Sequence, residues 1–334
     1  MRSKQPNPIR MTPPDFAAVI LAAGFGTRMK SDRPKVMHEI AHRAMIGHVV
    51  ASVAPLSPRR TAVVVGPDMG AVLAAAQRAA PQLSISAVEQ RERKGTGHAV
   101  AQTRTALSGI DGDVVILYGD VPLLRTETIS RALAMRRDGG HAVTVIGMRP
   151  DDPGAYGRLV VGPDGLLDRI VEASDADAAT RAIGLCNSGL MVVDGRALFS
   201  LIDRLSPDNA QREFYLTDII GHARAAGRSC SVVEAPAEEL TGVNSRAELA
   251  AAELALQTRL RAAAMAGGAT LTDPNSVWLS FDTAIGRDVQ IGPAVSFGPG
   301  VTVGDGARIG PFCHIENVRI AAGAVVPPGT HSGP

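Results

Sequence analysis

A glycine-rich loop directly after an apolar run is the feature of this sequence most suited to chemistry. Residues 17–21 predict a buried strand, which continues into Ala22-Ala23-Gly24-Phe25-Gly26-Thr27-Arg28. Small residues let a backbone approach a ligand closely, and successive N–H groups in such a loop bind anions. Arg28 adds a forked cation and Lys35 a point charge, so the segment predicts a polyphosphate site. It is not a Walker A loop, because no Gly-Lys-Ser/Thr follows, and the dinucleotide fingerprint lacks its third glycine.

A carboxylate follows a second predicted strand. Residues 114–117 are all apolar, and Asp120 comes just after their carboxyl end. Ligands bind at that end of the strands in open α/β sheets, and Mg²⁺ prefers one or two carboxylates together with substrate phosphates. Asp120 is therefore predicted to hold Mg²⁺ beside the polyphosphate. The alternative is a helix N-cap ahead of Pro122.

The elements that position these residues alternate between strands and helices. Apolar runs predict strands at 17–21, 61–65, 114–117, 142–146 and 190–193, and helical spacing predicts helices at 69–80 and 127–137. Strands that are apolar along their whole length are covered on both faces. This alternation predicts an α/β domain with a mostly parallel sheet and helices on both faces.

The last quarter of the chain has a different periodicity. Residues 245–265 predict a long helix, in which Ser245 and Glu248 can form a capping box. An apolar–Gly pair then recurs every six residues, at 285, 291, 297, 303 and 309, with a slip of one residue after Ile315. A period of six is typical of a parallel β-helix. The helix is interpreted as a connector between two domains.

Composition excludes several classes of protein. With 34 Lys and Arg against 33 Asp and Glu, the net charge of +1 disfavours a nucleic-acid or membrane-surface binder. No apolar run approaches the roughly 20 residues needed to span a bilayer. The 3 cysteines are far apart, which disfavours a zinc ribbon or a disulfide framework and favours a cytoplasmic location. The proline-rich start predicts a disordered leader, with Met1 and Met11 both open as the first residue.

Taken together, the motifs resemble one family, the bifunctional N-acetylglucosamine-1-phosphate uridyltransferase/glucosamine-1-phosphate acetyltransferases. The resemblance covers about residues 16–326 and follows the family's order. Besides residues 18–35, it rests on Gln90 with Gly95-Thr96-Gly97-His98-Ala99, Tyr118-Gly119-Asp120-Val121-Pro122-Leu123, Tyr156-Gly157-Arg158, Ile170-Val171-Glu172, Asn187-Ser188-Gly189, Glu213-Phe214-Tyr215-Leu216-Thr217-Asp218 and Gly242-Val243-Asn244.

The resemblance implies a fold, a reaction and a set of site residues. It implies a Rossmann-like nucleotidyltransferase domain at 16–244 after a leader at 1–15, a connector helix at 245–267 and a short left-handed β-helix at 268–334. The implied reaction forms UDP-N-acetylglucosamine and pyrophosphate from UTP and N-acetylglucosamine 1-phosphate, for cell-envelope precursors. Arg28, Lys35 and Asp120 are the implied catalytic residues, with Asp120 and Asn244 as Mg²⁺ ligands. The implied substrate-binding residues are Leu21, Ala22, Ala23, Gly24, Gln90, Gly95, Thr96, Tyr118, Gly119, Gly157, Glu172, Asn187 and Asn244.

Several site residues have simpler interpretations on their own. Gln90 could be a solvated residue beside Arg91, Asn244 the residue before a helix cap, and Glu172 the exposed end of a strand. His38 and His42 match the H-E-x-x-H pattern of zinc proteases, which needs both on one helix face. We interpret that match as chance, because the phosphate loop lies just upstream and no third ligand follows.

The resemblance also sets expectations for what the chain does not do. The family's acetyl-transfer site lies in later coils than those before Pro334, so we expect no acetyl transfer. The family's packing of three β-helices predicts a homotrimer. Two alternatives stay open: a nucleotidyltransferase for another nucleotide or sugar 1-phosphate, and a non-catalytic regulator that binds a nucleotide sugar.

Overall fold

The computed structural model describes residues 15–332, so the predicted leader lies outside the described residues except for Asp15. A nine-stranded sheet organises the first part of the chain. Its centre is a run of parallel strands, β1 (Phe16–Leu21), β4 (Arg60–Val65), β5 (Ile85–Glu89) and β6 (Asp113–Tyr118). The predicted parallel α/β sheet is confirmed here, and every strand of this run ends at the same edge.

The other strands depart from a purely parallel order. They are β7 (Val143–Met148), β8 (Arg158–Val161), β9 (Leu167–Val171), β10 (Cys186–Asp194) and β11 (Cys230–Glu234). Strand β10 lies antiparallel between β6 and β7. The β8–β9 hairpin precedes it in place of a crossover helix, so the chain re-enters the sheet in the opposite direction.

Helices cover both faces of the sheet. One face packs against α1 (Met45–Val53), α2 (Gly70–Ala79) and α4 (Thr126–Asp138), and the other against α3 (Thr96–Ala101), α6 (Gly195–Ile202) and α7 (Ile219–Ala225). In β1, Ala18 and Ile20 belong to the first core and Ala17 and Val19 to the second. Because successive side chains point to opposite faces, both faces need apolar residues, which explains the unbroken apolar run.

Short turns complete the domain. These are α5 (Ala178–Arg181), α8 (Ala237–Leu240) and the 3-10 turns η1 (Thr27–Met29), η2 (Lys35–Met37), η3 (Ala54–Leu56), η4 (Gln102–Arg104) and η5 (Leu216–Asp218). No helix within residues 15–332 is long and apolar enough to cross a membrane.

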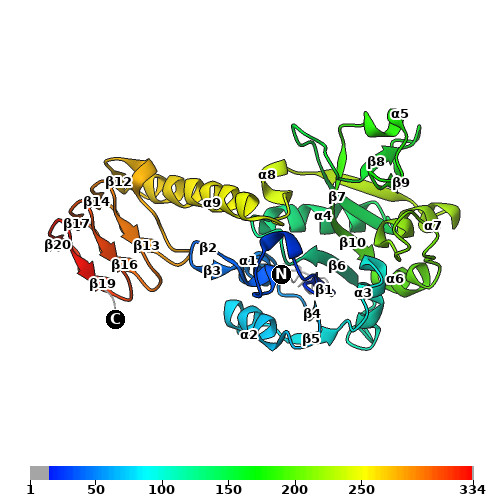
Figure 1. Ribbon diagram of the computed structural model, residues 1–334, viewed down its shortest axis with the longest axis horizontal. Helices are drawn as coiled ribbons and strands as arrows, with labels where there is room; N and C mark the ends of the chain where they lie inside the picture. The colour runs from blue at the N-terminus through cyan, green and yellow to red at the C-terminus, as the bar shows by residue number, and fades with distance from the viewer. Residues whose placement is uncertain (1–14, 333–334) are drawn as a thin grey trace, which may run out of the picture.

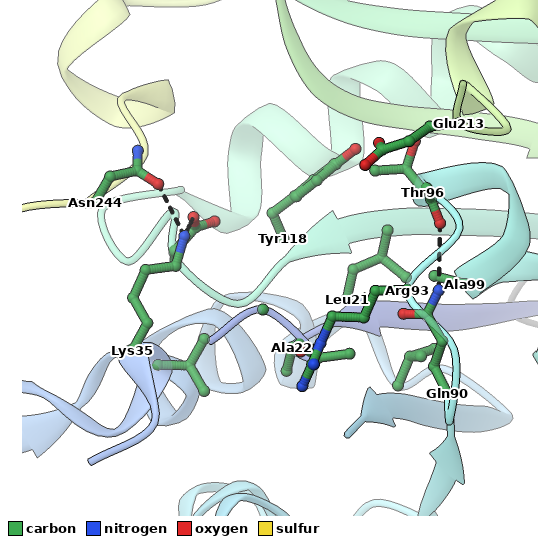
Figure 2. Close-up of a pocket in the computed structure, with 16 residues that line it drawn as sticks. Leu21, Ala22, Lys35, Gln90, Arg93, Thr96, Ala99, Tyr118, Glu213 and Asn244 are labelled. Carbon is green, nitrogen blue, oxygen red and sulfur yellow. Dashed lines mark hydrogen bonds and ion pairs between the residues drawn. The ribbon is translucent and has the colours of Figure 1, made fainter. Parts of the chain in front are cut away.

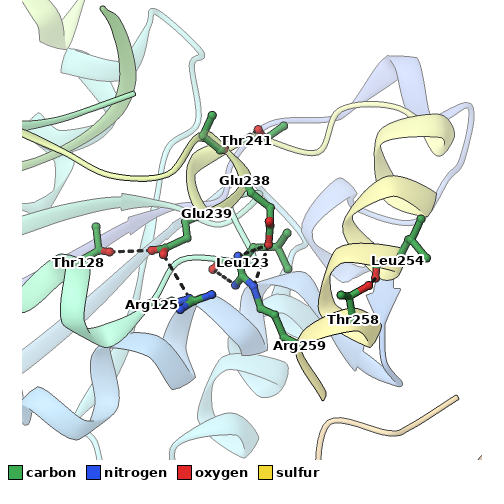
Figure 3. A network of polar contacts seen from close by, with 10 residues as sticks. Leu123, Arg125, Thr128, Glu238, Glu239, Thr241, Leu254, Thr258 and Arg259 are labelled. Carbon is green, nitrogen blue, oxygen red and sulfur yellow. Dashed lines mark hydrogen bonds and ion pairs between the residues drawn. The ribbon is translucent and has the colours of Figure 1, made fainter. Parts of the chain in front are cut away.

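Helix α9 (Arg246–Ala266) extends from this domain toward the C-terminal coils (Figure 1). Its predicted capping box between Ser245 and Glu248 is present. A polar network joins the helix to α8 and to the segment before α4 (Figure 3), in which Arg259 contacts Glu238 and donates to Leu123 O at 2.7 Å. The helix is therefore tied to the domain by directional contacts along its side.

Stacked two-residue strands form the C-terminal coils. They are β12 (Thr270–Leu271), β13 (Ala284–Ile285), β14 (Gln290–Ile291), β15 (Ser296–Phe297), β16 (Thr302–Val303), β17 (Arg308–Ile309), β18 (His314–Ile315), β19 (Arg319–Ile320), β20 (Val325–Val326) and β21 (His331–Ser332), with η6 (Pro274–Ser276) after β12. They pair in three parallel ladders, as a short β-helix requires. A Cβ at Gly310 would lie 2.5 Å from Pro328 N in the next coil, so the repeat needs glycine there. The predicted slip of one residue after Ile315 is also present.

The H-E-x-x-H segment forms a hairpin, not a helix. Strand β2 (Glu39–Ile40) pairs with β3 (Arg43–Ala44), so His38 and His42 do not share a helix face. The turn of the hairpin contacts the coils: Ala41 O accepts a bond from Phe281 N at 3.0 Å, and the Arg43 guanidinium lies 3.6 Å from the centre of the Phe281 ring. The hairpin therefore joins the coils to the segment that follows Lys35.

Candidate active site

A cavity of about 370 Å³ opens at the carboxyl edge of β1, β5 and β6 (Figure 2). This is the edge at which open α/β sheets bind ligands. Most of the predicted site residues line it, namely Leu21, Ala22, Ala23, Gly24, Lys35, Gln90, Gly95, Thr96, Tyr118, Asp120 and Asn244. Residues from five separate stretches of the sequence thus meet in one place.

The glycine loop and Lys35 pack against each other. Gly26 has φ +65°, a conformation that L side chains rarely adopt, and a Cβ there would lie 2.5 Å from Lys35 Cβ. The loop therefore needs glycine at position 26 both for its backbone and for the lysine stem. The arrangement directs the Lys35 ammonium toward the end of β6.

One ammonium joins the two predicted metal ligands. Lys35 Nζ forms an ion pair with Asp120 Oδ2 and donates to Asn244 Oδ1 at 2.9 Å (Figure 2). Asp120 is not a helix N-cap, since α4 begins at Thr126 with Arg125 as its cap residue. Because a single cation contacts both oxygens, the carboxylate and the amide oxygen fit a shared divalent cation.

The connector helix fixes the position of Asn244. Glu248 Oε2 accepts the backbone N–H of Asn244 at 2.6 Å and that of Ser245 at 2.8 Å. Asn244 therefore precedes the helix cap and also lines the cavity, so its two interpretations do not exclude each other. The capping box holds the Asn244 backbone while its side-chain oxygen faces Lys35.

Gln90 is an integral part of the cavity wall. Its side chain is only 4% exposed, so the solvated alternative is wrong. Gln90 Nε2 donates to Gly95 O at 3.3 Å and lies 3.1 Å from His98 Nδ1. These contacts hold the amide in one orientation, as reading a base edge requires.

A second cavity of about 360 Å³ adjoins the first. Both are lined by Tyr118, Asp120 and Asn244. Arg28 lines only the second, as do Tyr156 and Ser188. The structure therefore places Arg28 beyond Asp120 from the Gln90 end of the first cavity.

Three of the predicted substrate-binding residues, Gly157, Glu172 and Asn187, lie together next to residues of the second cavity. Asn187 N donates to Gly157 O at 2.8 Å, and a Cβ at Gly157 would lie 3.3 Å from Glu172 Oε2. The second cavity is lined by their neighbours Tyr156 and Ser188 and not by Gly157, Glu172 or Asn187 themselves.

Gly119 also lies outside both cavities, and its role is structural. It donates its N–H to Leu21 O at 2.9 Å, and a Cβ there would lie 3.0 Å from Val36 Cγ1. It thus holds the end of β6 against the end of β1 and against the residue after Lys35.

Glu172 is a partly buried carboxylate. Burial is the main cause that raises the pKa of the Glu172 carboxyl, and the nearby charges of Asp218 and Asp175 raise it further. The Thr217 hydroxyl, which donates to Glu172 Oε1 at 3.1 Å, lowers this pKa and so opposes the shift. The same effect acts on Tyr118, where burial is the main cause that raises the pKa of the phenol. A carboxylate kept in such surroundings is typical of a functional site.

Replacing Glu172 with Gln should stabilise the free protein at neutral pH and weaken sugar binding. A carboxyl group whose pKa is higher in the folded than in the unfolded protein stabilises the fold only while it is protonated. This contribution is complete below the unfolded pKa and is lost as pH rises through the folded pKa. The gain in melting temperature should therefore be present at pH 8 and vanish near pH 4. KM for the sugar phosphate should rise about tenfold, the value of one charged hydrogen bond.

The matched control for this prediction is Glu127→Gln, on the exposed surface of α4. It should change neither the melting temperature nor KM. Equal thermal shifts for the two variants across the pH range would show that the folded protein does not destabilise the ionised form of Glu172.

The sequence did not single out several lining residues. Arg93 and Glu213 line the first cavity, and Ala155, Gly242 and Glu248 the second. Arg93 lies in a charged run that locally predicts a solvated surface. Glu213 and Gly242 were within quoted motifs but had no role assigned, because local spacing does not show which side chain turns inward.

Both parts of the chain match known protein families. Residues 18–215 match the MobA-like NTP transferase domain, and residues 282–317 match the bacterial transferase hexapeptide repeats. Two solved structures share the fold: a UDP-glucose pyrophosphorylase complexed with UDP-glucose (TM-score 0.60, 17% identity, 73% of this chain and 99% of that one) and the inositol-1-phosphate CTP transferase from T. maritima (TM-score 0.55, 16%, 70% and 90%). Fold and site together define a nucleotidyltransferase.

Sequence relatives define the class more narrowly. The bifunctional protein GlmU of Rhodospirillum rubrum is 59% identical over 309 residues, which is 92% of this chain and 68% of the relative. That of Paramagnetospirillum magneticum is 52% identical over 320 residues, 96% and 70% of the two chains. The chain belongs to the GlmU family. It is a nucleotidyltransferase of the UDP-N-acetylglucosamine pyrophosphorylase type.

Proposed function

We propose that the two cavities divide the substrates, with UTP in the first and N-acetylglucosamine 1-phosphate in the second. The observation that supports this division is the shared wall: both cavities are lined by Tyr118, Asp120 and Asn244. The reacting phosphates of two substrates must meet, and the shared wall is where groups in the two cavities come closest. The uridylyl transfer would then take place beside Asp120.

Asp120 and Asn244 would hold Mg²⁺ at this junction. The supporting contact is the Lys35 ammonium, which binds an oxygen of each residue. Among residues 15–332 no group of three or more His, Cys, Asp or Glu could hold a metal, so the remaining ligands would be substrate phosphates and water. When bound, the ion neutralises the charge that develops on the reacting phosphates.

The remaining residues act by binding and orientation. The nucleophile is a phosphate oxygen that is already ionised at neutral pH, so no general base is needed. Lys35 would offset charge near the α-phosphorus. Arg28 lines only the second cavity, so it would bind the phosphate of the sugar 1-phosphate there and not the pyrophosphate, which leaves from the opposite side of the α-phosphorus. Gln90 would hydrogen-bond the uracil edge, and Glu172 and Asn187 would orient the sugar.

A panel of nucleoside triphosphates and sugar 1-phosphates tests this assignment, with pyrophosphate release as the measurement. UTP with N-acetylglucosamine 1-phosphate should be the best pair, because a site that hydrogen-bonds its substrate rejects analogues that lack those groups, by about 10⁴ in favourable cases. Preference for another nucleotide or equal turnover of glucose 1-phosphate would contradict it. Absence of turnover with every pair would favour a nucleotide-sugar-binding regulator.

We also propose that the chain assembles as a homotrimer through its coils and works in the cytoplasm. Large apolar side chains are exposed on the coils, with Phe312 at 66% and Val325 at 70%. Cyclic trimers bury such faces with closed symmetry. The three cysteines are buried free thiols, which suits a reducing compartment. Light scattering tests the assembly, and a monomer mass at micromolar concentration would refute it.

A further inference from the structure

One arginine in a charged run differs from its neighbours. Arg91 pairs with Glu89, and Lys94 pairs with Glu92, as solvated surface charges do. Arg93 forms no ion pair with any residue between 15 and 332, and its side chain turns into the wall of the first cavity (Figure 2). A guanidinium without a carboxylate partner beside a polyphosphate loop calls for a different explanation from surface solubility.

The glycine-rich loop holds this guanidinium in place. Arg93 Nε donates to Ala23 O at 2.7 Å, and its central carbon lies 3.3 Å from the centre of the Phe25 ring. Phe25 is otherwise 63% exposed, so the ring serves mainly as a platform for the cation. Arg93 thereby joins the loop after β1 to the loop after β5.

A third loop shapes the same position. A Cβ at Gly66, just after β4, would lie 2.9 Å from Arg93 Nη2. The absence of a side chain at Gly66 therefore lets the guanidinium lie against the backbone there. Three loops at the carboxyl edge of the sheet therefore contact one planar cation, which lines the cavity and stays exposed to solvent.

We propose that Arg93 is a nucleotide-binding residue, which clasps the phosphate loop through Ala23 and Phe25 and donates its terminal N–H groups to a phosphate oxygen of the nucleotide. The inference rests on the proposed role of the first cavity as the nucleotide site. Arginine suits this task because its planar fork can stack on a ring, bind a carbonyl and still bind phosphate.

Arg93→Met and Phe25→Leu, alone and combined, test the clasp. The control is Arg91→Met, which removes an exposed arginine two positions away. Without any substrate, hydrogen exchange at amides 22–28 should become faster in both clasp variants and stay unchanged in the control. Because Phe25 and Arg93 act together in the clasp, the combined effect in the double variant should be smaller than the sum of the two single effects.

Nucleotide binding gives the second measurement. The affinity for UTP alone, measured by calorimetry, should fall about tenfold in Arg93→Met, the value of one charge-assisted hydrogen bond. KM for UTP should rise with little change in KM for the sugar phosphate. Arg93→Lys should recover part of the UTP affinity but not the slow exchange. An ammonium lacks the planar group that stacks on the Phe25 ring while it donates to the Ala23 carbonyl.

The two readouts separate failure of this inference from failure of the proposed function. If another nucleotide proves to be the substrate, that nucleotide replaces UTP in the calorimetry and the exchange experiment is unaffected. If Arg93→Met matches Arg91→Met in both loop exchange and nucleotide affinity, while both keep the wild-type melting temperature, the clasp is refuted.

Discussion

Asp120→Asn should lower kcat for uridylyl transfer by about 10²–10³, the typical loss for one electrostatic element that acts on the transition state. The variant keeps the size of the side chain but removes the charge that pairs with Lys35 and is proposed to hold Mg²⁺. An amide oxygen is a weaker ligand than a carboxylate, so the remaining activity should need a higher Mg²⁺ concentration. Pyrophosphate release across a magnesium titration measures both effects.

The control for this prediction is Asp111→Asn, an exposed carboxylate shortly before β6. It should leave both kcat and the magnesium dependence unchanged. Asp120→Asn should also destabilise the protein by about 1–3 kcal/mol, because the Lys35 ammonium loses its charged partner in a partly buried site. Near-normal activity at low Mg²⁺ would show that Asp120 does not hold the metal.

The sequence predicted the elements that depend on local pattern. The apolar run of β1 predicts a strand that is buried on both faces, and the apolar–Gly pairs predict the six-residue coil. Each of these elements could therefore be predicted from its own residues. The antiparallel insertion of β10 could not, because an apolar strand has the same composition in either direction. Its direction follows from the β8–β9 hairpin, which returns the chain to the sheet from the other side.

The candidate site was predictable as a set of residues but not as a set of contacts. Lys35 meets Asp120 across 85 positions and Asn244 across 209, and no spacing in the sequence encodes such pairs. The same limit explains Gln90 and Arg93. Both stand in a polar run that predicts solvent exposure. Gln90 is instead buried in the cavity wall, and Arg93, although exposed, also lines the cavity.

The contact between Lys35 and the two oxygens leads to a prediction with opposite effects on activity and on metal binding. In the free protein the ammonium occupies the position between Asp120 and Asn244, and the side chains of Lys35 and Asp120 are 14% and 15% exposed. A divalent cation that uses both oxygens must displace that ammonium. Lys35 would therefore compete with the metal in the free protein and assist the reaction once the phosphates are bound.

Lys35→Met should lower kcat by about 10², because it removes a charge beside the reacting phosphates. In the same variant, the Asp120 carboxylate loses its partner, so the protein without metal should be less stable. Added Mg²⁺ or Mn²⁺ should then raise the melting temperature more than in the wild type, with no substrate present, because a ligand that binds only the folded state stabilises it.

The exposed lysine of the same loop supplies the control. Lys30→Met should leave activity, stability and the response to the metal unchanged, since Lys30 lies on the surface at the end of η1. The thermal shifts distinguish two explanations of lost activity. If Lys35→Met is inactive and Mg²⁺ shifts its melting temperature no more than that of the wild type, then Asp120 and Asn244 do not share a metal, and the Lys35 contacts are structural.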